Sequence, residues 1–192
     1  LIAELKCSHE TDESFATRWL RARKYDVDLA VEMVTGSAKW RKSREGGDPR
    51  KLASMEIDEI LGCPVEELRR FYPNAYCPIL DKAWRPVYIE RTGRLDIDAL
   101  LCSTDSERLL NWHLACQEGF NAKRCALATR QRGDGKVTDS NTFILDLEGF
   151  TMSQLNSVTR AYLSAAASVD SNNYPETMGK LLIINAPSLF TM

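Results

Sequence analysis

Residues 170–187 read DSNNYPETMGKLLIINAP, and four signals follow one another in this stretch. Polar residues end a helix of small residues, and residues 174–176 (Tyr-Pro-Glu) predict a short helical turn, since proline fits the first turn of a helix. Residues 179–180 (Gly-Lys) end that turn, and the unbroken apolar run 181–184 follows. Strands covered on both faces read as such runs. We therefore expect residues 180–184 to be a strand inside an α/β sheet rather than at an antiparallel edge.

Two further strands and two long helices are predicted earlier in the chain. Residues 86–91 and 141–147 are short, mainly apolar segments typical of strands. Residues 104–128 and 152–169 are predicted to be helices. Strands that alternate with helices require crossover connections, which produce parallel pairing. The fold class predicted from the sequence is therefore α/β, with a mostly parallel sheet.

The first quarter of the chain is predicted to be a helical bundle. One helix is expected at about residues 12–23 and a second at about residues 28–40, with apolar side chains at helical spacing. The sequence Gly-Gly-Asp-Pro at residues 46–49 is the clearest linker in the chain. We therefore expect a helical region at residues 1–48 and a larger lobe at residues 64–192.

The composition is that of an ordinary globular protein. Hydrophobic residues make up 44% of the 192 residues and charged residues 27%, both close to the average for soluble domains. The formal net charge of −2 gives no overall field that would attract nucleic acid. Six cysteines without C-x-x-C spacing and two distant histidines favour neither a zinc site nor a disulfide framework. We expect reduced thiols, a cytoplasmic location and no nucleic-acid partner.

Catalytic and membrane-spanning motifs are scarce. Residues 133–136 (Gly-Asp-Gly-Lys) resemble part of a phosphate-binding loop, but valine follows the lysine where Ser or Thr is required. The chain has no G-x-S-x-G nucleophile elbow, and His113 is most simply a structural residue of a helix. No apolar run approaches the ~18 residues that a membrane-spanning helix needs. We expect no catalysis, no metal and no cofactor.

Four parts of the sequence together resemble the CRAL-TRIO lipid-binding family, whose members include the yeast secretory phosphatidylinositol/phosphatidylcholine transfer proteins. In the family's order they are residues 19–27 with 38–42, residues 85–91, residues 143–150 and the stretch 170–187. The resemblance implies an N-terminal helical bundle and a lobe with a mostly parallel sheet. Helices would cover one face of this sheet, and the other face would floor an apolar lipid cavity. The resemblance also implies a chain truncated at its C-terminal end, with a gating helix and further strands beyond Met192.

The resemblance assigns lipid-headgroup contacts to Arg23, Glu176, Tyr76 and Tyr88. Arg23 is the second arginine of a Leu-Arg-Ala-Arg-Lys motif, and Glu176 can accept hydrogen bonds from inositol hydroxyls. Thr177 stands where phosphatidylinositol binders of the yeast type carry an arginine. Plainer interpretations remain open, because Arg23 can offset a helix dipole and Tyr88 can pack in a core.

Cavity-lining positions are implied for Asn141, Phe143, Leu145 and Ile183. The family places a pair of small hydroxyl residues in the second strand, where this chain has Asn141 and Phe143. Phenylalanine cannot hydrogen-bond a phosphate, which disfavours choline lipids and leaves room for another hydrophobic ligand.

The function implied by the resemblance is non-catalytic binding of a lipid and its transfer between membranes, with phosphatidylinositol the first candidate. The expected partners are membrane lipids, met in transient contacts at the membrane surface by a monomer. Two alternatives are a lipid-sensing docking module of a larger protein and a carrier of another apolar molecule, such as a tocopherol or retinoid.

Overall fold

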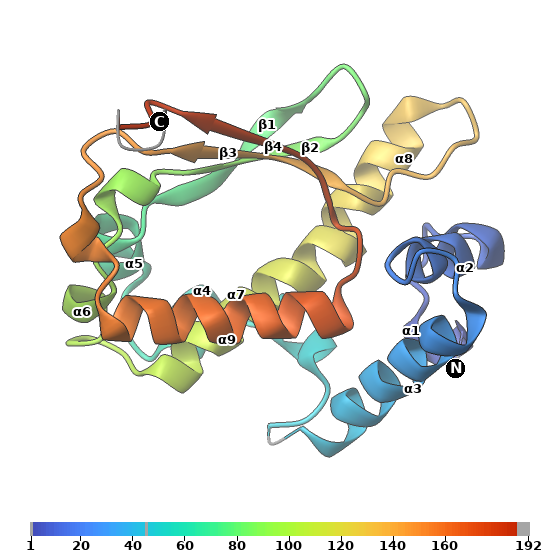
Figure 1. Cartoon of the computed structure of the whole chain (residues 1–192), viewed down its shortest axis with the longest axis horizontal. Coiled ribbons are helices and arrows are strands. Elements are labelled where there is room, and N and C mark those ends of the chain that lie inside the picture. Colours follow the sequence, from blue (N-terminus) through green and yellow to red (C-terminus); the bar gives the residue numbers. More distant parts are fainter. Residues whose placement is uncertain (1, 45, 188–192) are drawn as a thin grey trace.

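The structure is a computed structural model that describes residues 2–44 and 46–187. Three helices come first, α1 (Ile2–Leu5), α2 (Asp12–Arg21) and α3 (Val27–Ser43) (Figure 1). The Thr11 hydroxyl accepts a hydrogen bond from the Ser14 backbone N–H at 3.0 Å, and Ser14 Oγ accepts one from the Thr11 N–H at 2.9 Å. These reciprocal bonds satisfy two backbone donors that a helix start leaves unpaired, which fixes where α2 begins.

Helices α2 and α3 pack against each other through Phe15, Trp19 and Met33, which are all buried. The two helices predicted in this region are therefore present. Between them, Lys24 and Tyr25 adopt positive φ angles of 51° and 66°. Arg23 therefore lies just after the C-terminal end of α2, immediately before this tight corner.

Short helices η1 (Pro49–Ser54), α4 (Ile57–Leu61) and α5 (Val65–Phe71) lead to a hairpin of β1 (Asn74–Leu80) and β2 (Pro86–Glu90). The sequence did not predict β1. It pairs antiparallel with β2, and its register shifts between Tyr76 and Leu80. A strand that contains a proline and a register shift lacks the regular alternation that reveals strands in a sequence.

The sheet has four strands in the order β1-β2-β3-β4, with β3 at Asn141–Asp146 and β4 at Met178–Ile184. β3 pairs in parallel with both β2 and β4, which confirms the mostly parallel α/β sheet. Residues paired across neighbouring strands share one face of a sheet. One such row across the sheet consists of Tyr76, Tyr88, Phe143 and Leu181.

The predicted position of the last strand is wrong for the part of the chain that the structure describes. β4 is the final strand in the sheet order and is exposed along its whole length. It pairs in parallel with β3 on one side. An apolar run indicates side chains that favour burial, but it does not specify how many neighbouring strands or helices cover them.

The turn before β4 also differs from the prediction. Residues 174–176 form a non-helical turn in which Glu176 has a φ of 61°, and Gly179 lies within β4 instead of ending a helix. A Cβ atom on Gly179 would lie 2.6 Å from Ser140 Oγ. Glycine at this position therefore permits the close approach of β4 to the segment that precedes β3.

Two helical crossovers connect the parallel strands. The first contains η2 (Thr92–Arg94), α6 (Ile97–Leu100), α7 (Ser106–Gly119), the π-helical segment η3 (Phe120–Cys125) and α8 (Ala126–Arg132). The second contains η4 (Met152–Gln154) and α9 (Ser157–Asn173). The helix predicted at residues 104–128 is therefore present but continues to Arg132 through η3. None of the described helices is both long and apolar enough to cross a bilayer.

Helices α7 and α9 lie opposite the sheet (Figure 1). Tyr76, Tyr88 and Phe143 line a pocket together with residues of both helices. The expectation that helices cover one face and a cavity lies on the other is wrong, because the cavity lies between the sheet and these helices. Tyr72 packs edge-on against Trp112 of α7 and Tyr162 of α9, with ring centroids 5.4 and 6.2 Å apart. The three rings of this aromatic cluster lie between the sheet and the two helices and line the cavity. The division into residues 1–48 and 64–192 stays a prediction.

Candidate functional site

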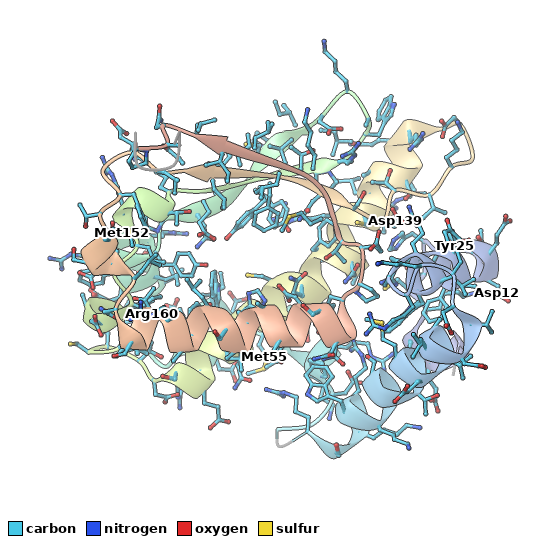
Figure 2. The ribbon with its side chains drawn as sticks, in the orientation of Figure 1. Asp12, Tyr25, Met55, Asp139, Met152 and Arg160 are labelled. Atoms are coloured by element: carbon cyan, nitrogen blue, oxygen red, sulfur yellow. The ribbon has the colours of Figure 1, made fainter. Side chains whose placement is uncertain are left out.

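A cavity of about 530 Å³ lies between the sheet and helices α7 and α9, within the usual size of ligand pockets, about 300–1,000 Å³. Figure 2 shows side chains of both layers pointing into this space. Six of the eight residues that the sequence singled out line it: Arg23, Tyr76, Tyr88, Asn141, Phe143 and Glu176. The other two, Leu145 and Ile183, are paired across β3 and β4 on the same face, but they lie outside the lining. The roles of all eight remain predictions.

The sheet side of the cavity is a continuous aromatic wall. The Tyr88 ring centroid lies 5.0 Å from that of Tyr76 and 4.6 Å from that of Phe143. Tyr76 also stacks on Phe120, and the Arg124 guanidinium lies 4.0 Å from its ring centroid. Burial raises the pKa values of both tyrosine hydroxyls, so these groups are neutral. The wall therefore presents apolar ring surface with uncharged polar edges.

Asn141 is the polar residue of this wall on β3 and is 4% exposed. Its Nδ2 donates a hydrogen bond to the Tyr76 hydroxyl at 3.5 Å. Its Oδ1 is buried and has no hydrogen-bond partner among the residues that the structure describes. Asn141 can thus hydrogen-bond a ligand through its amide, whereas the neighbouring inward position, Phe143, can only fill space.

Arg23 and Glu176 bring opposite charges to the same cavity. The Arg23 guanidinium donates to the Ala22 carbonyl oxygen at 3.0 Å and forms no ion pair within residues 2–44 and 46–187. Glu176 is exposed and, within those ranges, has no hydrogen-bond partner either. Both side chains are therefore available to a ligand, the guanidinium for a phosphate and the carboxylate for hydroxyl groups.

The turn that carries Glu176 is held from two sides. The buried Arg18 of α2 donates to the Pro175 carbonyl oxygen at 3.3 Å and to Glu10 Oε1 at 2.8 and 3.0 Å. The buried Tyr174 hydroxyl donates to Glu118 Oε1 of α7 at 2.5 Å. Because these bonds connect α2, the turn and α7, they fix the turn relative to the cavity.

Other residues of the lining are polar, and the sequence did not identify them as part of a site. Glu90, at the end of β2, is 8% exposed and accepts hydrogen bonds from the hydroxyls of Tyr72 and Thr92, each at 3.0 Å. Burial raises the pKa of Glu90. From α7 and α9, His113 and Asp170 also line the cavity, and His113 had been interpreted as structural. The i, i+4 spacing of His113 and Gln117 was the one sequence signal for this polar surface.

The described residues contain no group of three His, Cys, Asp or Glu side chains that could hold a metal ion. The cysteines are free thiols. Burial raises the pKa of Cys7 to about 11 and that of Cys116 to about 12. These two thiols therefore stay protonated and weakly nucleophilic near neutral pH.

A sheet and two helices around a cavity with a polar end define a ligand-binding domain, and comparison with known proteins gives its family. The family model of the CRAL/TRIO domain matches residues 72–192. The chain belongs to this family, as the resemblance in its sequence implied. A solved structure, that of Sfh5, superposes with a TM-score of 0.65 over 92% of this chain and 56% of its own, at 15% identity, and supports the fold.

Several curated relatives are similar along nearly the whole chain. The phosphatidylinositol/phosphatidylcholine transfer protein SFH12 of Arabidopsis thaliana is 33% identical over 195 residues, which cover 100% of this chain and 34% of that protein. The SEC14 cytosolic factor of Yarrowia lipolytica is 36% identical over 181 residues, covering 94% of this chain and 35% of that protein. The Sec14 cytosolic factor of Schizosaccharomyces pombe is 33% identical, covering 97% and 61%. The chain thus spans between a third and three fifths of the length of these relatives.

Proposed function

We propose that this chain binds a phospholipid in the cavity between its sheet and helices α7 and α9, and exchanges it between membranes without catalysis. Phosphatidylinositol is the first candidate ligand. The observation that carries the proposal is the cavity itself, with Arg23 and Glu176 among its lining residues and neither of them in an ion pair within the described chain. The printed names of the relatives, which include phosphatidylinositol/phosphatidylcholine transfer proteins, support the same ligand class.

The energetics favour a headgroup-selective exchanger. Burial of an acyl methylene contributes about 0.8 kcal/mol, but a bilayer offers nearly the same gain to the same chain. The acyl chains therefore give little net preference for the cavity over the membrane. The contacts that discriminate between lipids must come from polar side chains, and Arg23 with Glu176 supplies a cation for the phosphate and an acceptor for inositol hydroxyls.

Such exchange requires transient contact with a membrane surface, because acyl chains cross water at high cost. We propose that the protein makes this contact as a monomeric, cytoplasmic protein that associates peripherally with membranes. The relatives named cytosolic factors support the location. The proposed exchange uses no cofactor, and the bound lipid is its only ligand.

Choline lipids are poorer candidates for this cavity. Phe143, an inward-facing residue of β3, has no hydroxyl, and its ring packs against that of Tyr88. This part of the wall offers aromatic surface where a phosphate would need hydroxyl donors. We therefore propose inositol lipid before choline lipid.

The test is a loading assay with Glu176→Ala. The full-length protein is incubated with vesicles that contain phosphatidylinositol and phosphatidylcholine in equal amounts, and the bound lipids are counted by native mass spectrometry. We expect Glu176→Ala to reduce phosphatidylinositol loading roughly tenfold, because hydrogen bonds to a charged group are lost, with little change for phosphatidylcholine. Glu107→Ala, an exposed carboxylate on α7 outside the cavity lining, is the matched control. Equal loss of both lipids would contradict the assigned role of Glu176, and no lipid on the unmutated protein would contradict the function.

A further inference from the structure

Three polar side chains meet on the helical wall of the cavity. His113 Nε2 lies 2.8 Å from Asp170 Oδ1, and Gln117 Nε2 donates to the same oxygen at 2.9 Å. His113 and Gln117 belong to α7 and Asp170 belongs to α9, and all three line the cavity. The side chains of His113 and Asp170 are 19% and 33% exposed. We name these three residues the α7–α9 cluster.

The protonation pattern of the α7–α9 cluster follows from the carboxylate at its centre. An ionised carboxylate only accepts hydrogen bonds, so both neighbours must donate to Asp170. The imidazole of His113 therefore carries a proton on Nε2. Gln117 must turn its NH₂ group to the carboxylate, which leaves its carbonyl oxygen Oε1 free.

Two free atoms of the α7–α9 cluster are therefore acceptors whatever the charge of His113. They are Gln117 Oε1 and Asp170 Oδ2, neither of which has a hydrogen-bond partner within the described residues. Glu90, on β2 in the same cavity, accepts one hydrogen bond on each of its oxygens. The α7–α9 cluster thus presents unused acceptors on the helices, as Asn141 Oδ1 does on β3.

This pattern restricts which apolar ligand fits best. A plain hydrocarbon chain laid over the α7–α9 cluster would displace water and return no hydrogen bond, which is unfavourable for polar atoms. A ketone or ester oxygen would place an acceptor against acceptors. A hydroxyl group donates a hydrogen bond and so replaces the lost water.

We propose that the α7–α9 cluster is a second polar subsite of the cavity, and that it selects apolar ligands that carry a hydroxyl group on their buried part. The inference rests on the proposed lipid-binding function and adds a ligand class to it. A cluster that served only to tie α7 to α9 would use the two bonds to Asp170 Oδ1 and would not distinguish ligands by the polar group they carry.

The test compares fatty acids that differ at one carbon. Stearic acid, hydroxystearic acids with the hydroxyl at successive chain positions, and the matching ketostearic acids compete with a fluorescent polyene fatty acid for the full-length protein. We expect the best hydroxystearic acid to displace the reporter about tenfold more strongly than its ketone, the effect of about one hydrogen bond in a water-poor site. The ketone controls for size and polarity.

Asp170→Asn sharpens the test because it keeps the shape of the side chain. The asparagine Oδ1 still accepts from His113 and Gln117, while the free Oδ2 becomes an NH₂ donor. We expect the preference for hydroxyl over ketone to shrink to about equality or to reverse. Asp28→Asn, on the exposed side of α3 and outside the cavity lining, should leave the preference unchanged.

Each outcome has a distinct meaning. Equal displacement by hydroxyl and ketone acids on the unmutated protein, with the reporter bound, would overturn the inference and leave lipid binding intact. An unaltered preference in a folded Asp170→Asn variant would also overturn it. Failure of the reporter to bind the unmutated protein would overturn the inference, whereas the phosphatidylinositol loading assay decides the proposed function. If Asp170→Asn does not fold, the comparison on the unmutated protein decides.

Discussion

β2 and β4 belong to one sheet and have opposite burial. β2 contains Tyr88 and Glu90, yet both side chains are less than a tenth exposed. β4 ends in the apolar run Leu-Leu-Ile-Ile, yet Leu181 is 44% exposed and Ile183 53%. The more polar strand is thus the buried one. Burial in this sheet is set by what packs on a strand, and the apolar character of the strand alone does not determine it.

The neighbours of the two strands explain the difference. β2 lies between β1 and β3, and Glu90 at its end meets Tyr72, which packs against Trp112 and Tyr162. β4 has β3 on one side and, among the described residues, no second strand partner. The β2 side of the cavity is therefore a packed wall, while β4 is exposed in the part of the chain that the structure describes.

The largest effect expected from this contrast is that of Tyr72→Ala. The substitution removes the ring between Trp112 and Tyr162 and leaves Glu90 without one of its two donors. We expect the free energy of unfolding to fall by about 3–5 kcal/mol, the usual cost of a large aromatic deletion from a core. Chemical denaturation measures it.

Tyr25→Ala is the matched control, because Tyr25 is 64% exposed at the corner between α2 and α3. Its effect should lie within about 0.5 kcal/mol, as for most surface substitutions. A loss below about 1 kcal/mol for Tyr72→Ala would mean that the aromatic cluster does not hold the β2 side of the cavity together.

A smaller effect, with a definite pH dependence, is expected for Glu90→Gln. Because burial raises the pKa of Glu90 in the folded protein, the native state binds this proton more tightly than the unfolded state does. The stability that the group contributes is complete below its ordinary pKa of 4.5 and is lost as the pH rises through the raised native value. Glutamine keeps an acceptor for Tyr72 and has no proton to lose.

Glu90→Gln should therefore be at least as stable as the unmutated protein at neutral pH, and its stability should vary less with pH between about 4 and 8. Unfolding free energies measured across that range test this expectation. Glu107→Gln, on an exposed carboxylate, should leave the pH profile as it was. A variant that loses stability at neutral pH but not in acid would show that the carboxylate form of Glu90 supports β2.

The same contrast shows how far the sequence could be read. Local signals located β2, β3, β4 and the two long crossover helices, because each has its own periodicity or apolar run. β1 was missed because its proline and shifted register hide the alternation. The exposure of β4 among the described residues could not be predicted, since an apolar run contains no information about which elements pack on it.

The candidate site was only partly predictable for a similar reason. The resemblance to a family selected Arg23, Tyr76, Tyr88 and Glu176, which do line one cavity. His113 and Asp170 are 57 residues apart, and only the packing of α7 on α9 brings them together. The free acceptors of Asp170 and Gln117 follow from a shared carboxylate oxygen, which no local pattern of the sequence reveals.

The smallest effect, and the one that can break the contrast, is expected on the outer face of the sheet. Ile89 of β2 and Leu182 of β4 lie in the same row, on either side of Ile144. Ile89 is half-buried, whereas Leu182 is 38% exposed.

Threonine is compatible with strands, so Ile89→Thr and Leu182→Thr test burial rather than strand propensity. We expect Ile89→Thr to cost about 1–2 kcal/mol of unfolding free energy and Leu182→Thr at most about 0.5 kcal/mol. An equal cost for both in the full-length protein would mean that another segment covers β4 as thoroughly as β2 is covered, and the apolar run would then report true burial.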